Sequence, residues 1–154
     1  MKYRFEILER AIGKERPRVN RRTGAVYTPT KTSSFEKKVQ WAFKAKYNIA
    51  EKPSEKEFKV KIIAYFKPAK DLSKKKKQEL IDGEFGFLYR PDSDNIAKAI
   101  LDSLNGLAYK DDSQVASLSI CKLYGAENKI IVELEEIWKS MEYMKITNMS
   151  SVDL

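Results

Sequence analysis

Histidine is absent from the 154 residues, and cysteine occurs once, at Cys121. The lack of histidine excludes Ser-His-Asp and Cys-His catalysis and histidine-ligated zinc. A single cysteine excludes an intramolecular disulfide and a cysteine-rich zinc site. Any chemistry that this chain performs must therefore use carboxylates and lysines, and a metal that takes part should be a hard cation bound by oxygen.

Long apolar segments are also missing. No run of 18 apolar residues occurs, so the sequence predicts no membrane-spanning helix and no membrane partner. The first ten residues, MKYRFEILER, lack the apolar centre of a signal peptide, which predicts a cytoplasmic protein. The length predicts one domain over residues 1–146, followed by a polar tail over residues 147–154.

The formal net charge is +8, and it is unevenly distributed along the chain. Residues 1–50 contain 13 Lys and Arg against 4 Asp and Glu, whereas residues 91–154 contain 6 against 11. A basic first part and an acidic last part are typical of a protein that brings a polyanion to a group of carboxylates. The composition fits a protein that merely has a high pI equally well, so charge alone does not decide the function.

Hydrophobic periodicity predicts a mixture of strands and helices. Alternation predicts strands over residues 3–7, 57–66, 114–124 and 129–137, with the last two joined as a hairpin by the turn at 125–128. Ser33 and Glu36 predict a capping box at the start of a helix that runs to about Tyr47. Further helices are predicted over residues 71–81 and from about residue 95 to 104. This order predicts a single compact α/β (α+β) domain in which a mixed β-sheet packs with helices.

The two tryptophans, Trp41 and Trp138, stand at positions with apolar spacing. We therefore expect them to be core or dimer contacts rather than platforms on which bases stack.

Residues 13–32 have no periodicity and contain many cations. The basic residues of this segment are Lys14, Arg16, Arg18, Arg21, Arg22 and Lys31, and Glu15 is its one acid. The segment is interpreted as a long loop or β-arm that contacts DNA phosphates. A solvated loop is the alternative, and the role of the run from Lys74 to Lys77 stays open.

Carboxylates stand in two pairs near the ends of the predicted helix in RPDSDNIAKAILDSL. Asp92 and Asp94 precede this helix, and Asp111 and Asp112 follow it. In an extended segment, Asp92 and Asp94 would project to the same side. Two such carboxylates with a further pair fit a site for Mg²⁺ or Mn²⁺. The alternative is that these acids are ordinary helix caps and turn residues.

The order and spacing of these motifs resemble the RusA family of Holliday-junction resolvases, endonucleases that are common in prophages. The family pattern has D-x-D-N at the start of a helix, a lysine four residues later and a following D-D-x-Q-V. This sequence has Asp92-Ser-Asp94-Asn95, then Lys98, then Asp111-Asp112-Ser-Gln114-Val115, so the resemblance covers about residues 90–123. The block GKERPR…YTPTKT looks like the arm of phage-borne members.

The resemblance implies a RusA-like fold and a metal-dependent endodeoxyribonuclease that resolves four-way DNA junctions by symmetric hydrolysis. By the resemblance, the catalytic residues are Asp92, Asp94, Lys98 and Asp112, and the three aspartates bind Mg²⁺, with Mn²⁺ possible. It also implies a homodimer, and no small-molecule cofactor is expected. The competing hypothesis is a non-catalytic basic DNA-binding module whose aspartates are caps and turn residues.

Overall fold

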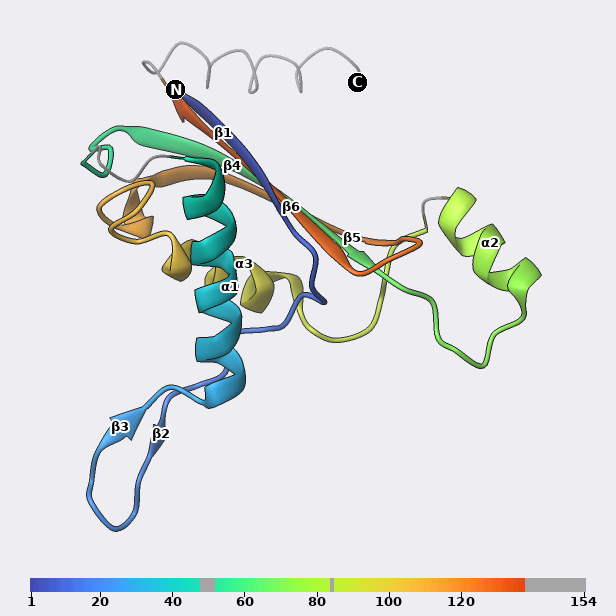
Figure 1. Ribbon diagram of the computed structural model, residues 1–154, viewed down its shortest axis with the longest axis horizontal. Helices are drawn as coiled ribbons and strands as arrows, with labels where there is room; N and C mark the ends of the chain where they lie inside the picture. Colours follow the sequence, from blue (N-terminus) through green and yellow to red (C-terminus); the bar gives the residue numbers. More distant parts are fainter. Residues whose placement is uncertain (48–51, 84, 138–154) are drawn as a thin grey trace, which may run out of the picture.

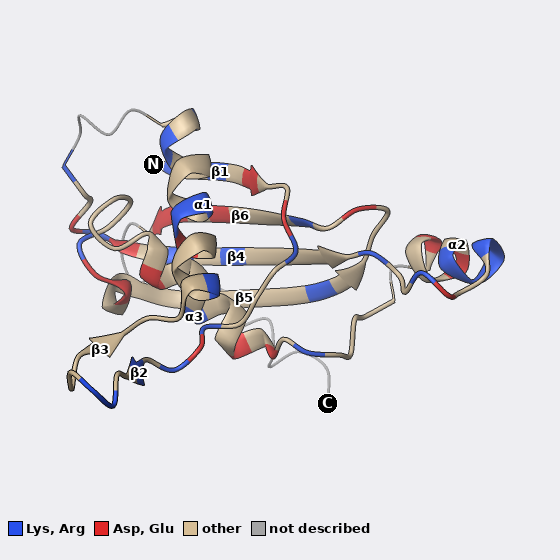
Figure 2. Ribbon diagram, turned by 60° about the horizontal axis from the view of Figure 1, so that its bottom comes forward, with Lys and Arg blue, Asp and Glu red and all other residues tan. Residues whose placement is uncertain are grey.

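The computed structural model describes residues 1–47, 52–83 and 85–137. A four-stranded mixed sheet forms one layer, and the helices α1 (Thr30–Lys46) and α3 (Ser93–Ser103) pack together on one of its faces (Figures 1 and 2). The single-domain mixed α/β fold that the sequence predicts is therefore confirmed. The predicted tail over residues 147–154 lies outside the described residues.

The sheet has the order β1 (Lys2–Ile7), β6 (Lys129–Ile137), β4 (Glu57–Phe66), β5 (Val115–Tyr124). β4 pairs with β6 in the antiparallel sense and with β5 in the parallel sense. The alternating residues of β4, which include Phe58, Val60 and Ile62, are almost completely buried. β5 is less buried and lies at the edge. The central position of β4 thus follows from its more apolar sequence.

The prediction of a β-hairpin over residues 114–137 is wrong, because β4 lies between β5 and β6. The connection at 125–128 passes the end of β4 and hydrogen-bonds to it, instead of forming the turn of a hairpin between β5 and β6. The Gly125 amide donates to the Phe66 carbonyl (3.0 Å), and the Asn128 side chain accepts from the Lys67 amide (3.0 Å).

α1 begins three residues before the predicted capping box. Its N-cap position is Pro29, and the Ser33 amide already donates to the Pro29 carbonyl (3.0 Å), so Ser33 lies inside the helix. Phe35, Val39 and Phe43 are buried on one side of this helix. Trp41 is 66% exposed, so of its two predicted roles the core position is wrong and the dimer contact is untested. Trp138 lies outside the described residues.

The short helix α2 (Lys74–Asp82) begins later than the predicted residue 71, since Ser73 caps it by accepting from the Lys76 amide (3.2 Å). None of its residues is buried.

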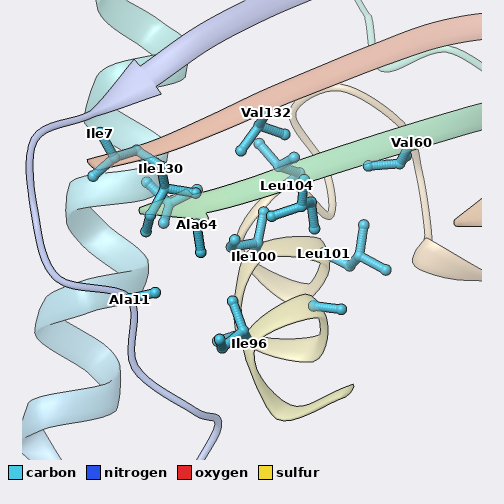
Figure 3. Packing of buried hydrophobic residues seen from close by; sticks show 14 of the residues in the cluster. Ile7, Ala11, Val60, Ala64, Ile96, Ile100, Leu101, Leu104, Ile130 and Val132 are labelled. Atoms are coloured by element: carbon cyan, nitrogen blue, oxygen red, sulfur yellow. The ribbon is translucent and has the colours of Figure 1, made fainter. Parts of the chain in front are cut away.

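α3 has an apolar side, as the helical spacing of its isoleucines and leucines in the sequence indicates. Its inward residues Ile96, Ala97, Ile100, Leu101 and Leu104 are all buried. Figure 3 shows Ile96, Ile100 and Leu104 packed beneath side chains of β4 and β6. Burial of an isoleucine or leucine stabilises a fold by about 1.5–3 kcal/mol, so this contact holds α3 firmly in place.

Residues 18–27 form a β-arm that extends away from the sheet (Figure 1). β2 (Arg18–Val19) pairs with β3 (Val26–Tyr27) in the antiparallel sense. The Asn20 side chain accepts from the amides of Arg22 (2.9 Å) and Thr23 (3.3 Å), and Gly24 adopts φ +70° in the turn. Part of the predicted segment 13–32 is therefore a β-arm, and its contact with DNA stays a prediction. Within the described part of the chain, none of the helices is long and apolar enough to cross a membrane.

Glu136 should stabilise the fold, because it is only 8% exposed and has three cationic or hydroxyl donors. It accepts from the hydroxyl of Ser54 (2.7 Å), the amino group of Met1 (3.0 Å) and the ammonium of Lys56 (3.1 Å). Burial alone would raise the pKa of Glu136, but these hydrogen bonds lower it below the usual value. We expect Glu136→Gln to reduce the free energy of unfolding by about 1–3 kcal/mol at pH 7.

Because the pKa of Glu136 is lowered in the folded state, its contribution is complete above the unfolded pKa and is lost as the pH falls through the folded pKa. Thermal unfolding should therefore separate wild type from Glu136→Gln at pH 7 and bring them together at acidic pH below that pKa. The exposed neighbour Glu135 provides the control, since Glu135→Gln should change stability by less than about 0.5 kcal/mol. Equal stability of Glu136→Gln and wild type at pH 7 would contradict this assignment.

Candidate active site

Asp92 and Asp94 stand at the start of α3, where both side chains are exposed. Asp92 is the N-cap residue and Asp94 belongs to the first helical turn. The prediction that both lie in one extended segment is therefore wrong, because the helix begins at Ser93 instead of near Asn95. Asp92 has the extended backbone of an N-cap, yet its carboxylate makes no capping hydrogen bond. The Asp92 carboxylate thus occupies a capping position without acting as a cap.

The backbone in front of Asp92 is held by β5. The Lys122 ammonium donates to the carbonyl oxygens of Tyr89 (2.8 Å) and Pro91 (3.0 Å), and it lies 5.9 Å from the centre of the Phe87 ring. The Arg90–Pro91 peptide bond is cis. Sequence reasoning missed Lys122, because a lysine in an edge strand gives no sign of which loop it will contact.

Asp111 and Asp112 have different environments although they are neighbours. Asp111 caps the short 3₁₀ turn η1 (Asp112–Gln114), and its carboxylate accepts from the Ser113 amide (3.1 Å). This hydrogen bond lowers the pKa of Asp111. Asp111 is thus a turn residue, as the alternative interpretation of the acids proposes for all of them.

Gln114 fixes the turn that carries Asp112. Its side-chain oxygen accepts from the amides of Lys110 (2.9 Å) and Asp111 (3.1 Å). Its side-chain nitrogen donates to the carbonyls of Ser54 (2.9 Å) and Lys56 (2.7 Å), in the segment that leads into β4. The glutamine of D-D-x-Q-V therefore links the acidic turn to the central strand of the sheet.

Asp112 is partly buried beside Asp102, the last acid of α3. Burial raises the pKa of Asp112, and the charges of Asp102 and Asp111 and a side-chain hydrogen bond with Asp102 raise it further. Tyr109 lies beneath this group, fully buried, and donates its hydroxyl to the Leu101 carbonyl (2.9 Å). Asp112 therefore lies in a place where its charge is unfavourable unless a cation or proton offsets it.

Lys14 connects Asp102 to α1. Its ammonium lies 3.0 Å from the Asp102 carboxylate and also pairs with Glu36. Burial alone would lower the pKa of Lys14, but the hydrogen bonds with Glu36 and Asp102 raise it. Lys14 was predicted to contact DNA, and in the structure its charge is engaged within the chain. Sequence reasoning missed Asp102 and Glu36 as members of this group, since a lone acid on a helix is usually a solvated surface residue.

The predicted metal ligands lie at two ends of α3. Asp94 and Asp102 are eight residues apart, which at 1.5 Å per residue is about 12 Å along the helix axis. Asp112 is beside Asp102, which places it near the other end of α3 from Asp94. Over the described ranges, no three His, Cys, Asp or Glu side chains are grouped so that they could hold a metal ion. The carboxylate chemistry fits Mg²⁺, but the spacing within one chain does not.

A cleft of about 790 Å³ opens beside the start of α3. Its walls are residues 9–15, the first half of α1, residues 90–92 and Asn95, so Asp94 is not part of the lining. The charged residues of the lining are Glu9, Arg10, Lys14, Glu15, Lys31, Lys38, Arg90 and Asp92. Five of these eight are cations, but Lys14 and Lys38 pair with carboxylates of the chain. Arg10, Lys31 and Arg90 are therefore the cations that can attract an anionic ligand toward Asp92.

The predicted site residues are divided between three places. The cleft contains Asp92, Lys14 and Lys31, whereas Arg18, Arg21 and Arg22 are exposed on the arm and Arg16 is exposed just before it. Arg18 pairs with Glu15 (3.1 Å). Lys98 is exposed one turn after Asp94, between the two acidic ends of α3. Sequence reasoning missed Arg10, Lys38 and Arg90 in the cleft, because no spacing distinguishes them from other surface cations.

Comparison with known proteins agrees with the motifs and the fold. The family model described as "Endodeoxyribonuclease RusA" matches residues 10–135, which include the cleft, α3, the acidic turn and most of the sheet. The chain is also 32% identical over 138 residues to the uncharacterized protein YqaN of Bacillus subtilis (strain 168). That similarity covers 87% of this chain and 96% of the relative. The protein thus belongs to the RusA endodeoxyribonuclease family, whose members resolve Holliday junctions.

Proposed function

We propose that this protein is a Mg²⁺-dependent endodeoxyribonuclease that resolves four-way DNA junctions by symmetric cleavage of two strands. The observation that carries the proposal is the basic cleft with Asp92 in its wall. A carboxylate placed among Arg10, Lys31 and Arg90 faces the part of the surface that a phosphate backbone would approach.

The environment of Asp92 favours this function over a non-catalytic DNA-binding module. A purely structural aspartate at the N-cap would accept a hydrogen bond from the first helical turn. The Asp92 side chain makes no such bond, whereas Asp111 does act as a cap. The two aspartates at N-cap positions therefore differ: Asp111 makes the capping hydrogen bond, and Asp92 does not. The Asp92 carboxylate thus keeps its oxygens available for a ligand.

We assign the catalytic roles to Asp92, Asp94, Lys98 and Asp112, with the three carboxylates as the donors for Mg²⁺. Hard oxygen ligands are the ones that Mg²⁺ prefers, and Mn²⁺ accepts the same set. The exposed Lys98 ammonium would offset negative charge on the scissile phosphate. Lys31 and the exposed arginines Arg16, Arg18, Arg21 and Arg22 would bind the DNA backbone around the cleft, whereas Lys14, which pairs with Asp102 and Glu36, would hold these two acids in place.

A homodimer is part of the proposal, because a four-way junction presents two strands for cleavage at related positions. A two-fold symmetric pair supplies two sites in the matching arrangement. Asp92 and Asp94 lie at the start of α3 and Asp112 lies near its end. In a dimer, Asp112 of one chain and Asp92 with Asp94 of the other could together complete one site. Apolar residues near Trp138, Met141 and Met144 could supply part of the dimer contact, and this segment lies outside the described residues.

Replacement of single aspartates tests the catalytic assignment. Asp92→Asn, Asp94→Asn and Asp112→Asn each remove an anionic donor with little change in size, so nicking of a synthetic junction in Mg²⁺ should fall by roughly a thousandfold or more. Junction affinity in EDTA should persist or increase, because a carboxylate repels the phosphate. Asp111→Asn is the matched control, since asparagine caps nearly as well as aspartate and nicking should persist. A stable Asp94→Asn protein that nicks normally would disprove the assignment.

Removal of the arm's charges tests its role in DNA binding. Replacement of Arg16, Arg18, Arg21 and Arg22 by alanine should weaken junction binding and reduce the slope of log affinity against log salt by about 0.9 for each phosphate that the variant no longer binds. Replacement of Lys74 to Lys77 by alanine is the control, because it removes the same number of positive charges, four, from α2. An unchanged slope in the arm variant, with a reduced slope in the α2 variant, would move the DNA contact to α2.

Mixing two inactive variants tests the dimer and the shared site. Sedimentation equilibrium should give a dimer at micromolar concentration. If Asp92 of one copy acts with Asp112 of the other, a heterodimer of Asp92→Asn and Asp112→Asn chains retains one intact site and should nick one strand. If each chain holds a complete site, both sites of this heterodimer are defective and no nicking appears. A fully active monomer would contradict the dimer proposal.

A further inference from the structure

Trp41 is exposed on the outer surface of α1, with 66% of its surface accessible to solvent. A tryptophan has a large apolar surface that is normally buried in a core or an interface. α1 meets its packing requirement through Phe35, Val39 and Phe43, which are buried on its other side. The exposed indole is therefore available for a ligand instead of for the fold.

The position of Trp41 continues the wall of the basic cleft. Ser34 and Lys38 line that cleft from α1. Residues 34, 38, 41 and 45 follow one another at intervals of three or four, so they form one row along the helix surface. Trp41 thus lies in the same row as the cleft-lining residues, about one turn beyond Lys38. A chain-like ligand that leaves the cleft along α1 would meet the indole next.

The charges around Trp41 define the ligand that fits this surface. Lys37 precedes it by four residues and Lys44 follows it by three, so both flank the indole on the helix. Both lysines are exposed. The neighbouring Lys38 pairs with Glu9, whereas the ion pairs of the described residues include neither Lys37 nor Lys44. A second copy of the same basic surface would be repelled, whereas a polyanion with flat apolar groups would be attracted.

We propose that Trp41 is a stacking platform for an unpaired base of the DNA strand that leaves the cleft, with Lys37 and Lys44 beside its phosphates. Stacking of bases on aromatic side chains next to cations is the general way in which proteins bind single-stranded nucleic acid. The inference rests on the proposed function, because it assigns to that substrate a contact outside the cleft. It replaces the expectation that Trp41 is a core or dimer residue.

The intrinsic fluorescence of Trp41 offers a direct test. In a Trp138→Phe protein, Trp41 is the remaining tryptophan, since the chain contains two. Iodide should quench its fluorescence readily in the free protein. A saturating short single-stranded oligonucleotide, or a junction with unpaired bases at the branch, added in EDTA should quench the emission and protect the indole from iodide. If Trp138→Phe impairs folding, the difference between wild type and Trp41→Phe gives the same signal.

Affinities distinguish stacking from simple exposure. Trp41→Ala should bind the oligonucleotide about tenfold more weakly, whereas Trp41→Phe should retain most of the affinity because a phenyl ring also stacks. Leu118→Ala is the control, since Leu118 is an exposed apolar residue on β5, 45% accessible. Unchanged fluorescence and iodide access at saturating oligonucleotide would overturn the inference. A change in Trp41 emission on dilution without DNA would identify a second copy as the occupant and would also overturn it.

The outcomes separate this inference from the nuclease proposal. Junction nicking in Mg²⁺ without any response of Trp41 to DNA would contradict the role of Trp41 alone. A response of Trp41 to the oligonucleotide in a protein that never nicks would support the stacking contact and contradict the nuclease. Absence of DNA binding altogether would contradict both.

Discussion

The burial of one side of α3 against β4 and β6 is the interaction on which the candidate site depends. Ile96 and Ile100 are fully buried beneath the sheet, and they fix both the position and the rotation of the helix. A side chain on the opposite surface, such as Lys98, is then directed outward by the geometry of the helix alone. The site does not require a specialised backbone to expose its charges, because the hydrophobic core already determines which residues face the solvent.

The same rigidity explains why the acids form two groups. A helix is a stiff rod, so a residue near its start and a residue near its end cannot approach one another without unfolding it. The turn with Asp112 lies beside Asp102 near the end of α3 and is attached to the sheet through Gln114. This attachment holds Asp112 near the end of the helix that is remote from Asp94. The arrangement in one chain therefore favours contacts that each end of α3 makes separately.

Much of the fold could be predicted from the sequence because burial imposes periodic patterns. The bounds of β4 and the apolar side of α3 followed from alternation and from helical spacing. The order of the strands did not follow, since alternation shows that a strand has a buried side but not which strand lies beside it. β5 and β6 are adjacent in sequence and separated in the sheet by β4, a long-range result of how apolar each strand is.

The candidate site was predictable where a motif is local. Asp92, Asp94 and Asp112 stand in short patterns that mark them, and the family model includes all three positions. Lys122, Asp102 and Glu36 carry no such mark, because their partners are brought to them by the tertiary fold. The start of α1 was misplaced for a related reason: a Ser and a Glu at capping-box spacing do not act as a cap when the preceding turn is already helical.

The β-arm has a consequence for how this protein can change over evolutionary time. Its strands contain no buried residue, and its turn is closed by bonds among its own residues, with Asn20 accepting from Arg22 and Thr23. Substitutions or changes of length in the arm therefore leave the core packing intact and cost little folding free energy. Related chains can diverge in the arm, and so in the surface that it offers to a ligand, while the sheet and α3 remain the same.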